Sequence, residues 1–179
     1  MIRHPRYTRE RLAQTSERLR AAIHPETVGP DELLVAGPEG RIPLAAGQRL
    51  EYRPASSGER RGPRGATDGG RIGATVPEAW AGRRVDLLWQ TEAESTLWID
   101  GRAVQGLHGT GPHERPDATV AWPARGGERL ELQVELACNG LFGKLDRPPE
   151  LERCELALVD EDAWKLYFDF EVLRALEAS

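Results

Sequence analysis

Cysteine is scarce in this chain of 179 residues, which contains only Cys138 and Cys154. Two cysteines are too few for the disulfide framework of a small secreted domain, and both lie in apolar stretches where buried free thiols are common. We therefore expect a reducing compartment, the cytoplasm. A chain of this length can bury an ordinary hydrophobic core without disulfide or metal staples, so one main domain is expected.

Long apolar runs are missing as well. No stretch approaches the roughly 20 apolar residues that cross a bilayer, and the N-terminus lacks the continuous apolar segment of a secretory signal. Arginines recur through residues 3–20, as they do in organelle transit peptides. However, Pro5, Glu10 and Glu17 favour an ordinary solvated helix face. The sequence predicts no association with membranes.

The chain also has no excess of positive charge, since 24 basic residues stand against 29 acidic ones and the formal net charge is -5. This balance gives no general attraction to nucleic acid, so no nucleic-acid partner is expected. Five arginines do crowd residues 53–71, but no strand-to-helix context or phosphate-loop spacing accompanies them. Because this segment is rich in glycine, we expect a mobile surface loop at 53–71.

Common catalytic signatures are not found. The sequence has no nucleophile elbow, no cysteine–histidine pair in a catalytic context and no glycine fingerprint for dinucleotides. His108, His113 and Glu114 share one segment and could in principle ligate a metal ion. The glycines and proline around them leave no rigid element to fix the ligand geometry. We therefore expect no catalytic residue, metal or cofactor in this chain.

The clearest positive signal is a set of short strands. Residues 85–89 and 97–99 are apolar, and Asp100-Gly101 follows the second run with the residues that a type I′ hairpin turn requires. Residues 129–136 alternate strictly between apolar and polar side chains, which predicts one face on the core and one in water. Further short strands are separated by glycine and proline. We predict a mainly β fold, an antiparallel β-sandwich of jelly-roll, galactose-binding-like type.

Helices are predicted at the two ends of the chain. Residues 8–23 have apolar side chains at near-helical spacing, and Pro25 ends that helix. Asp160 precedes a second helix. Val159, just before Asp160, and Trp164, in the first turn, have the spacing of a hydrophobic staple. The predicted organisation is an N-terminal helix, a β-sandwich domain and a C-terminal helix, over residues 1–24, 25–159 and 160–179 respectively.

Apolar side chains cover more than one stripe of the C-terminal helix. Because that is too much apolar surface for a free helix, we expect it to lie between two bodies. An Asn-Gly turn after residue 138 also carries an apolar tip that must pack on something. The resulting candidates for a domain interface are Cys138, Asn139, Gly140, Leu141, Phe142, Trp164, Tyr167 and Phe168. The five tryptophans could instead stack on sugars, although core packing explains most of them more simply.

Five blocks of sequence stand out, of which VQG and ACNG are unusual strings: VPEAWAGRRV at 76–85, Trp89 followed by LWIDG and VQGL within 97–107, VELACNGLFG at 134–143, ELALV at 155–159 and AWKLYFDFEVL at 163–173. In this order and with these gaps, they resemble the N-terminal region of the cytosolic and vacuolar type of α-mannosidase in glycoside hydrolase family 38. The sequence departs from the family at 68–74, where DGGRIGA replaces an aromatic strand. A short or frayed strand is expected there.

The resemblance implies a retaining hydrolase of α-linked mannosides and free oligosaccharides, with a zinc ion and an Asp nucleophile in its catalytic domain. The corresponding zinc-binding block and nucleophile do not occur before Ser179. The resemblance therefore implies a non-catalytic N-terminal domain, inactive alone, whose partner is its own catalytic domain. A homo-oligomer, a free-standing carbohydrate-binding sandwich and a pure assembly module remain open alternatives.

Overall fold

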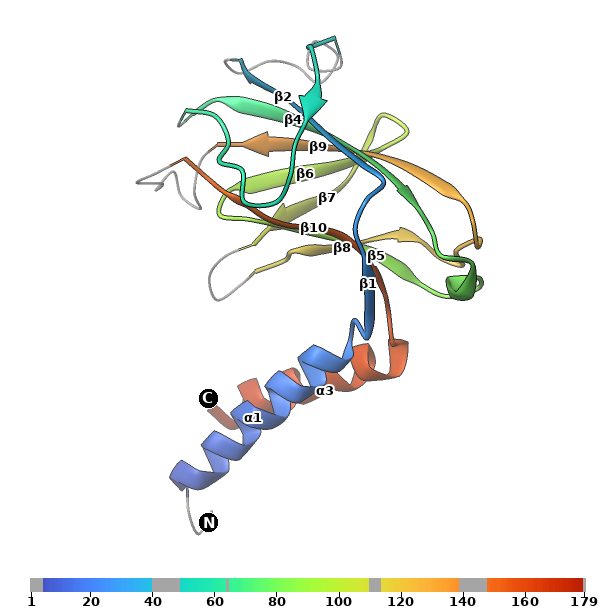
Figure 1. Cartoon of the computed structure of the whole chain (residues 1–179). Helices are drawn as coiled ribbons and strands as arrows, with labels where there is room; N and C mark the ends of the chain where they lie inside the picture. The colour runs from blue at the N-terminus through green and yellow to red at the C-terminus, as the bar shows by residue number, and fades with distance from the viewer. Residues whose placement is uncertain (1–4, 40–48, 64, 110–113, 139–147, 179) are drawn as a thin grey trace. The chain divides into compact units, whose positions relative to one another are not determined.

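The computed structural model of the chain describes residues 5–39, 49–63, 65–109, 114–138 and 148–178 (Figure 1). The chain divides into two compact units. The β unit is Val28–Leu156, and the helical unit combines Met1–Thr27 with Ala157–Ser179. Within the described ranges, no helix is both long and apolar enough to span a bilayer.

Two sheets make up the strand-rich part of the chain. One has four strands in the order β1-β10-β5-β8, and the other has six in the order β3-β2-β4-β9-β6-β7. Every pairing in the six-stranded sheet is antiparallel, and so is the pairing of β5 with β8. The strands are β1 (Glu26–Val28), β2 (Glu32–Glu39), β3 (Arg53–Pro54), β4 (Thr67–Thr75), β5 (Val85–Thr91), β6 (Glu94–Ile99), β7 (Arg102–His108), β8 (Asp117–Ala121), β9 (Arg129–Ala137) and β10 (Leu151–Leu158).

The predicted hairpin is confirmed between β6 and β7. Asp100 and Gly101 have φ angles of 50° and 72°, the two positive values that a type I′ turn needs. Leu97 lies opposite Gln105 and Ile99 opposite Arg102 in the antiparallel register. The turn sets the register next to it, the register shifts by one residue between Leu97 and Trp98, and β7 continues beyond the predicted residue 105.

The alternating strand is confirmed as β9, which lies between β4 and β6 near the middle of its sheet. Its side chains at Leu132, Val134 and Leu136 are buried, whereas Glu131 is exposed. Period two thus places one face on the core, as expected for a half-buried strand. By contrast, residues 85–89 in β5 are buried without alternation, as their continuous apolar sequence predicts.

The prediction for 68–74 was wrong, and so was the C-terminal boundary of the predicted loop 53–71. Thr67–Thr75 forms the nine-residue strand β4, which pairs with β2 on one side and β9 on the other. Far from being frayed, this strand is one of the inner strands of the six-stranded sheet.

Glycines in β4 explain why composition misled the prediction. A Cβ atom at Gly69 would lie 2.7 Å from the Tyr52 hydroxyl, and one at Gly70 would lie 3.4 Å from the Trp89 ring. These glycines leave room for side chains from neighbouring segments. Glycine inside a strand commonly marks such a close approach, so it does not break the strand here.

A hydrophobic core lies between the two sheets. The buried residues of this core come from strands of both sheets: Leu33, Ile72, Leu97, Leu107, Leu132 and Val134 from the six-stranded sheet, and Leu87, Trp89, Ala118, Leu151 and Cys154 from the four-stranded sheet. Trp89 Nε1 donates a buried hydrogen bond of 3.0 Å to Ser95 Oγ. This bond connects β5 with β6, one strand from each sheet, and gives the indole nitrogen its partner. The predicted jelly-roll sandwich is confirmed.

The helical unit consists of α1 (Pro5–Ala22) and α3 (Glu161–Ala178), which run antiparallel and side by side (Figure 1). The Asp160 backbone N–H donates to the Ile23 carbonyl at 2.8 Å, which brings the end of α1 to the beginning of α3. Further along, Ser16 Oγ donates to Glu171 Oε1 at 2.5 Å. Helices were predicted at both ends of the chain, but their packing on each other was not.

Candidate functional site

The beginning of α3 is fixed by Asp160. Its Oδ1 accepts hydrogen bonds from the backbone N–H groups of Asp162 at 3.1 Å and Ala163 at 3.0 Å. These bonds satisfy two donors that a helix leaves unpaired at its first turn. The Trp164 N–H donates to the Asp160 carbonyl at 2.9 Å, the first bond of the regular helix. The sequence-based start of this helix is confirmed.

Three of the predicted interface residues form an aromatic cluster in the first turns of α3. The ring centroids of Trp164 and Phe168 are 4.6 Å apart, and those of Tyr167 and Phe168 are 5.2 Å apart. Both spacings suit tilted or edge-to-face aromatic packing. Trp164 and Tyr167 are half-buried, whereas Phe168 is exposed. The cluster is therefore a partly covered patch, and its role as an interface stays a prediction.

Apolar residues also occur on the side of α3 that faces away from α1. We call this surface the outer face and define it by its large exposed side chains, Leu166, Phe168, Val172, Leu173 and Leu176. The half-buried positions recur on the opposite side with helical spacing, at Ala163, Tyr167, Phe170 and Arg174. The helix is thus apolar on two sides.

Cys138, another interface candidate, is completely buried and packs with Ala93 and Leu136. Its backbone N–H donates to the Ala66 carbonyl at 2.9 Å, and its carbonyl accepts from Gly65 at 3.1 Å. Since the side chain has no exposed surface, it offers nothing to a partner in this structure. The four remaining candidates, Asn139, Gly140, Leu141 and Phe142, lie outside the described residues.

Neither cysteine is a nucleophile in this environment. Burial raises the pKa of the Cys138 thiol to about 12, with the nearby Asp68 carboxylate adding to the rise. Burial likewise raises the pKa of Cys154 to about 12. Because the thiolate is the reactive form, both groups stay protonated and inert near neutral pH. Both cysteines are free.

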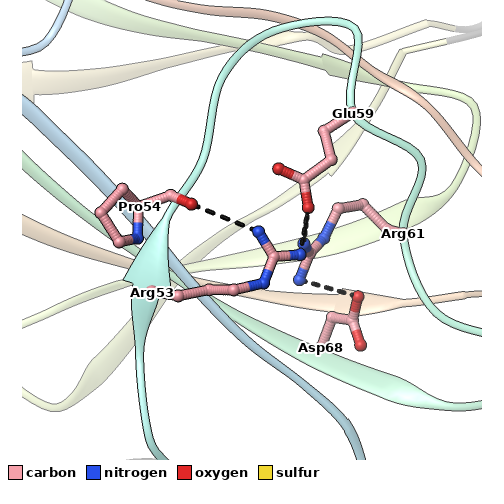
Figure 2. A network of polar contacts seen from close by, with 5 residues as sticks. All are labelled: Arg53, Pro54, Glu59, Arg61 and Asp68. Atoms are coloured by element: carbon pink, nitrogen blue, oxygen red, sulfur yellow. Dashed lines mark hydrogen bonds and ion pairs between the residues drawn. The ribbon is translucent and has the colours of Figure 1, made fainter.

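A polar network that the sequence did not reveal lies between β4 and residues 55–63, a segment that we call the strap (Figure 2). Arg61 Nη2 forms an ion pair of 3.0 Å with Asp68 Oδ2, and the two residues are only 5% and 1% exposed. Arg61 Nη1 also donates to Glu59 Oε1 at 3.0 Å. Arg53 pairs with the same Glu59 oxygen from the more exposed side.

The two carboxylates of this network respond to it in opposite directions. Burial raises the pKa of Asp68 above its ordinary value, although the Arg61 charge opposes the rise. A hydrogen bond from Arg53 lowers the pKa of Glu59, which is less buried. Desolvation dominates at the first site and hydrogen bonding at the second. Nothing in this arrangement resembles the paired carboxylates of a glycosidase, because Asp68 is enclosed and already occupied by Arg61.

Backbone hydrogen bonds also fasten the strap to the sandwich. Gly58 N–H donates to the Leu151 carbonyl at 2.8 Å, and Leu151 N–H donates to the Glu59 carbonyl at 3.0 Å. Arg61 N–H donates to the Pro149 carbonyl at 2.7 Å. The strap therefore connects β3, in the six-stranded sheet, with the beginning of β10 in the four-stranded sheet. Its role is architectural.

The histidines give no support for a metal site. His108 ends β7 and exchanges backbone hydrogen bonds with Arg115, while His113 lies outside the described residues. Within the described part of the chain, no group of three or more His, Cys, Asp or Glu residues is placed to hold a metal ion. The expectation that this chain binds no metal stays a prediction.

The tryptophans differ in exposure. Trp80 and Trp89 are buried in the core, and Trp98 and Trp164 are partly covered. Trp122 is 65% exposed and follows β8 directly. Core packing therefore accounts fully for Trp80 and Trp89, whereas the ring of Trp122 is exposed to solvent.

These observations define a class, an antiparallel β-sandwich of jelly-roll type with a two-helix unit at its termini. The family model described as "Alpha-mannosidase, jelly roll domain" matches residues 32–166. The chain belongs to this family of α-mannosidase jelly-roll domains. The match runs from β2 through the sandwich into α3 and ends within the aromatic cluster, after Trp164 and before Tyr167.

Curated relatives agree with this family. The chain is 35% identical over 143 residues to alpha-mannosidase 2C1 of Homo sapiens, covering 74% of this chain and 14% of that protein. It is 29% identical over 136 residues to alpha-mannosidase G of Dictyostelium discoideum, covering 70% and 12% respectively. The chain thus spans about a seventh of the length of the human relative.

Solved structures give a weaker likeness. A β-glucuronidase from Ruminococcus gnavus in complex with uronic isofagomine matches with a TM-score of 0.49 and 10% identity, covering 74% of this chain and 28% of that one. A likeness at this level carries no argument about activity.

Proposed function

We propose that this chain serves as the non-catalytic jelly-roll domain of an α-mannosidase, a retaining hydrolase of α-linked mannosides and free oligosaccharides. The observation that carries the proposal is the family match over residues 32–166, which covers the whole six-stranded sheet and most of the rest of the sandwich. The small share of each relative that this chain covers supports a role as one part of a larger enzyme.

In this proposal, the chemistry belongs to the catalytic part of the parent enzyme. By the resemblance, a zinc ion there would orient the sugar hydroxyls, and an Asp would form the glycosyl intermediate. The described residues of this chain supply neither a metal-binding group of side chains nor a free pair of facing carboxylates in the polar network. The chain contributes a rigid scaffold beside the catalytic part.

A hydrolysis assay tests this division of roles. Purified chain and full-length parent enzyme would each be incubated with an aryl α-mannoside in the presence of zinc. We expect release of the aryl group by the parent enzyme only. Turnover by this chain alone would place catalytic residues within it and overturn the proposal. Failure of the parent enzyme to act on any α-mannoside would overturn the assigned activity.

We also place the parent enzyme in the cytoplasm. Two buried, unpaired cysteines support a reducing compartment, since an oxidising one favours paired or absent cysteines. A fusion of the full-length protein to a fluorescent reporter should give a diffuse cytoplasmic signal. A signal confined to an organelle would contradict this assignment.

Carbohydrate binding is a second candidate function, and the exposed ring of Trp122 is the observation that favours it. Aromatic faces stack on the apolar faces of sugars, and a jelly-roll sandwich can carry such a site. Titration with mannose and mannobiose should then change the tryptophan fluorescence saturably, and Trp122→Ala should abolish the change. An unchanged signal in the unsubstituted chain would remove this candidate.

A further inference from the structure

We propose that the outer face of α3 is a docking surface, covered in the parent enzyme by the catalytic part of the same α-mannosidase. This inference rests on the proposed function, because it takes its partner from the larger enzyme. It goes beyond that function by naming the surface and the residues that make the contact.

The apolar residues of the outer face are continuous in space. At 100° per residue, Phe168, Val172 and Leu176 follow one another along the helix, and Leu173 lies beside them. All four are exposed, and Leu173 is 66% exposed. Lys165 and Asp169 are exposed charged residues on this side, and Val172, Leu173 and Leu176 follow them along the helix. Through residue 176, the large exposed side chains after Asp169 are therefore apolar, which is typical of a surface that contacts another body.

Packing within the helical unit does not account for this patch. α1 already covers the opposite side of α3, where Ser16 reaches Glu171. α1 contains five basic and two acidic residues, whereas α3 contains five acidic and two basic residues. The two helices thus complement each other in charge. A helix that is apolar on both sides is expected to lie between two bodies, and α1 supplies only one of them.

A second copy of this chain is a poor occupant of the outer face. Pairing two copies of α3 would bring two acidic helices together, and like charges oppose that contact. Five apolar side chains on one helix also fall short of the roughly 20 residues per partner found in stable interfaces between separate molecules. A contact made within one enzyme needs less surface, because the linkage raises the effective concentration of the partner.

Cysteine labelling measures whether the outer face is covered. The native thiols do not interfere from within this chain, since both are buried and protonated. Leu173→Cys places a reactive thiol on the outer face. Val104→Cys is the matched control, because Val104 is an exposed apolar residue on β7, in the β unit. Each variant would be prepared in this chain and in the full-length enzyme, and labelling by a maleimide would be followed peptide by peptide with mass spectrometry.

We expect the thiol at position 173 to react at least about tenfold more slowly in the full-length enzyme than in this chain, because it reacts only when the contact opens. The thiol at position 104 should react at similar rates in both. Equal rates at position 173 would overturn the proposal. Protection at position 173 that develops in this chain alone as its concentration rises would also overturn it, because a second copy would then cover the face.

Amide hydrogen exchange tests the same contact without any substitution. Peptides that contain residues 172–176 should exchange more slowly in the full-length enzyme than in this chain. The mannoside assay on the same preparation separates the two proposals. If the enzyme hydrolyses the mannoside but α3 is not protected, the docking proposal is overturned and the proposed function is kept. If α3 is protected but the enzyme has no mannosidase activity, the docking contact is supported and the proposed function is overturned.

Discussion

The β unit and the helical unit bury their apolar residues to different degrees. Among the described residues, the large apolar side chains that are exposed include five on α3 and Tyr7 on α1, but only Val104 and Trp122 in the longer β unit. The β unit has a closed core between two sheets and a strap across its edge. The helical unit is two helices thick and leaves one apolar side uncovered. A sandwich can complete its own core, whereas this pair of helices leaves large apolar side chains of α3 exposed.

The largest expected loss in the free energy of unfolding comes from a substitution in the core of the β unit, and it tests how tightly that core is packed. Leu97 is fully buried at the centre of the core. Leu97→Ala removes its contacts and leaves a cavity that the rigid sheets cannot close, so the free energy of unfolding should fall by about 4 kcal/mol. Urea unfolding followed by tryptophan fluorescence measures it. Val104→Ala, at an exposed position, is the control, and an equal loss in both variants would contradict a well-packed core.

A second, smaller effect concerns the buried ion pair that fastens the strap. Asp68→Ala leaves the Arg61 guanidinium buried with only Glu59 nearby, and we expect a loss of about 3 kcal/mol in the free energy of unfolding. Arg60→Ala is the matched control, since Arg60 lies in the same strap but its side chain is exposed. If both variants lose the same small amount, the strap is held by its backbone hydrogen bonds and not by the ion pair.

The same pair gives a pH dependence whose sign is fixed by the raised pKa of Asp68. Because the native state holds the proton more tightly than the unfolded state, stability falls as pH rises from the ordinary to the raised pKa. The difference in free energy of unfolding between wild type and Asp68→Asn should therefore shrink as pH rises through this range. A difference that grows with pH would mean that the attraction of Arg61 outweighs burial and that the pKa is lowered.

A still smaller effect tests how α3 begins. Asp160→Ala removes the acceptor for two backbone N–H groups and should lower the free energy of unfolding of the helical unit by about 1 kcal/mol. Asp160→Asn should recover most of the loss, because its side-chain oxygen can still accept these bonds. Hydrogen exchange of the first turn of α3 localises the effect. If Asp160→Asn is as destabilising as Asp160→Ala, charge at the helix end matters more than the cap.

The smallest expected change in the free energy of unfolding comes from a substitution on the outer face of α3. Leu173→Ser in this chain alone should change the free energy of unfolding by no more than about 0.5 kcal/mol, because the side chain is already in water. The same substitution in the full-length enzyme should be more destabilising if the outer face is covered there. Thermal unfolding of both proteins, each against its own wild type, provides the measurement. A large loss in this chain alone would show that Leu173 packs within it.

Local signals in the sequence predicted much of the fold. The Asp100-Gly101 turn, the alternation in β9 and the cap at Asp160 depend on residues within a few positions of each other, so composition and spacing are enough. β4 was mispredicted because glycine usually weakens a strand. The close approach of the Tyr52 hydroxyl and the Trp89 ring, which makes glycine suitable there, depends on segments distant in the chain.

The candidate surfaces were predicted less completely. Surplus apolar residues in the C-terminal helix indicated a second contact, and exposure in the structure agrees with such a surplus. Which residues face outward could not be known before α1 was seen to pack on the other side. The Arg61–Asp68 pair had no sequence signal at all, because a charged pair in a glycine-rich segment is ordinarily solvated.

The sequence by itself determined that this chain forms short antiparallel strands between two helices and that it resembles the first domain of an α-mannosidase. Those conclusions rest on side-chain periodicity, turn chemistry and uncommon strings, all of which are local. Only the tertiary structure decided that the glycines of β4 lie within a sheet, that Cys138 and Asp68 are enclosed and that α3 keeps one side exposed. Whether a glycine, a thiol or a charged side chain is enclosed depends on distant segments that meet in space, so no local pattern could specify it for these residues.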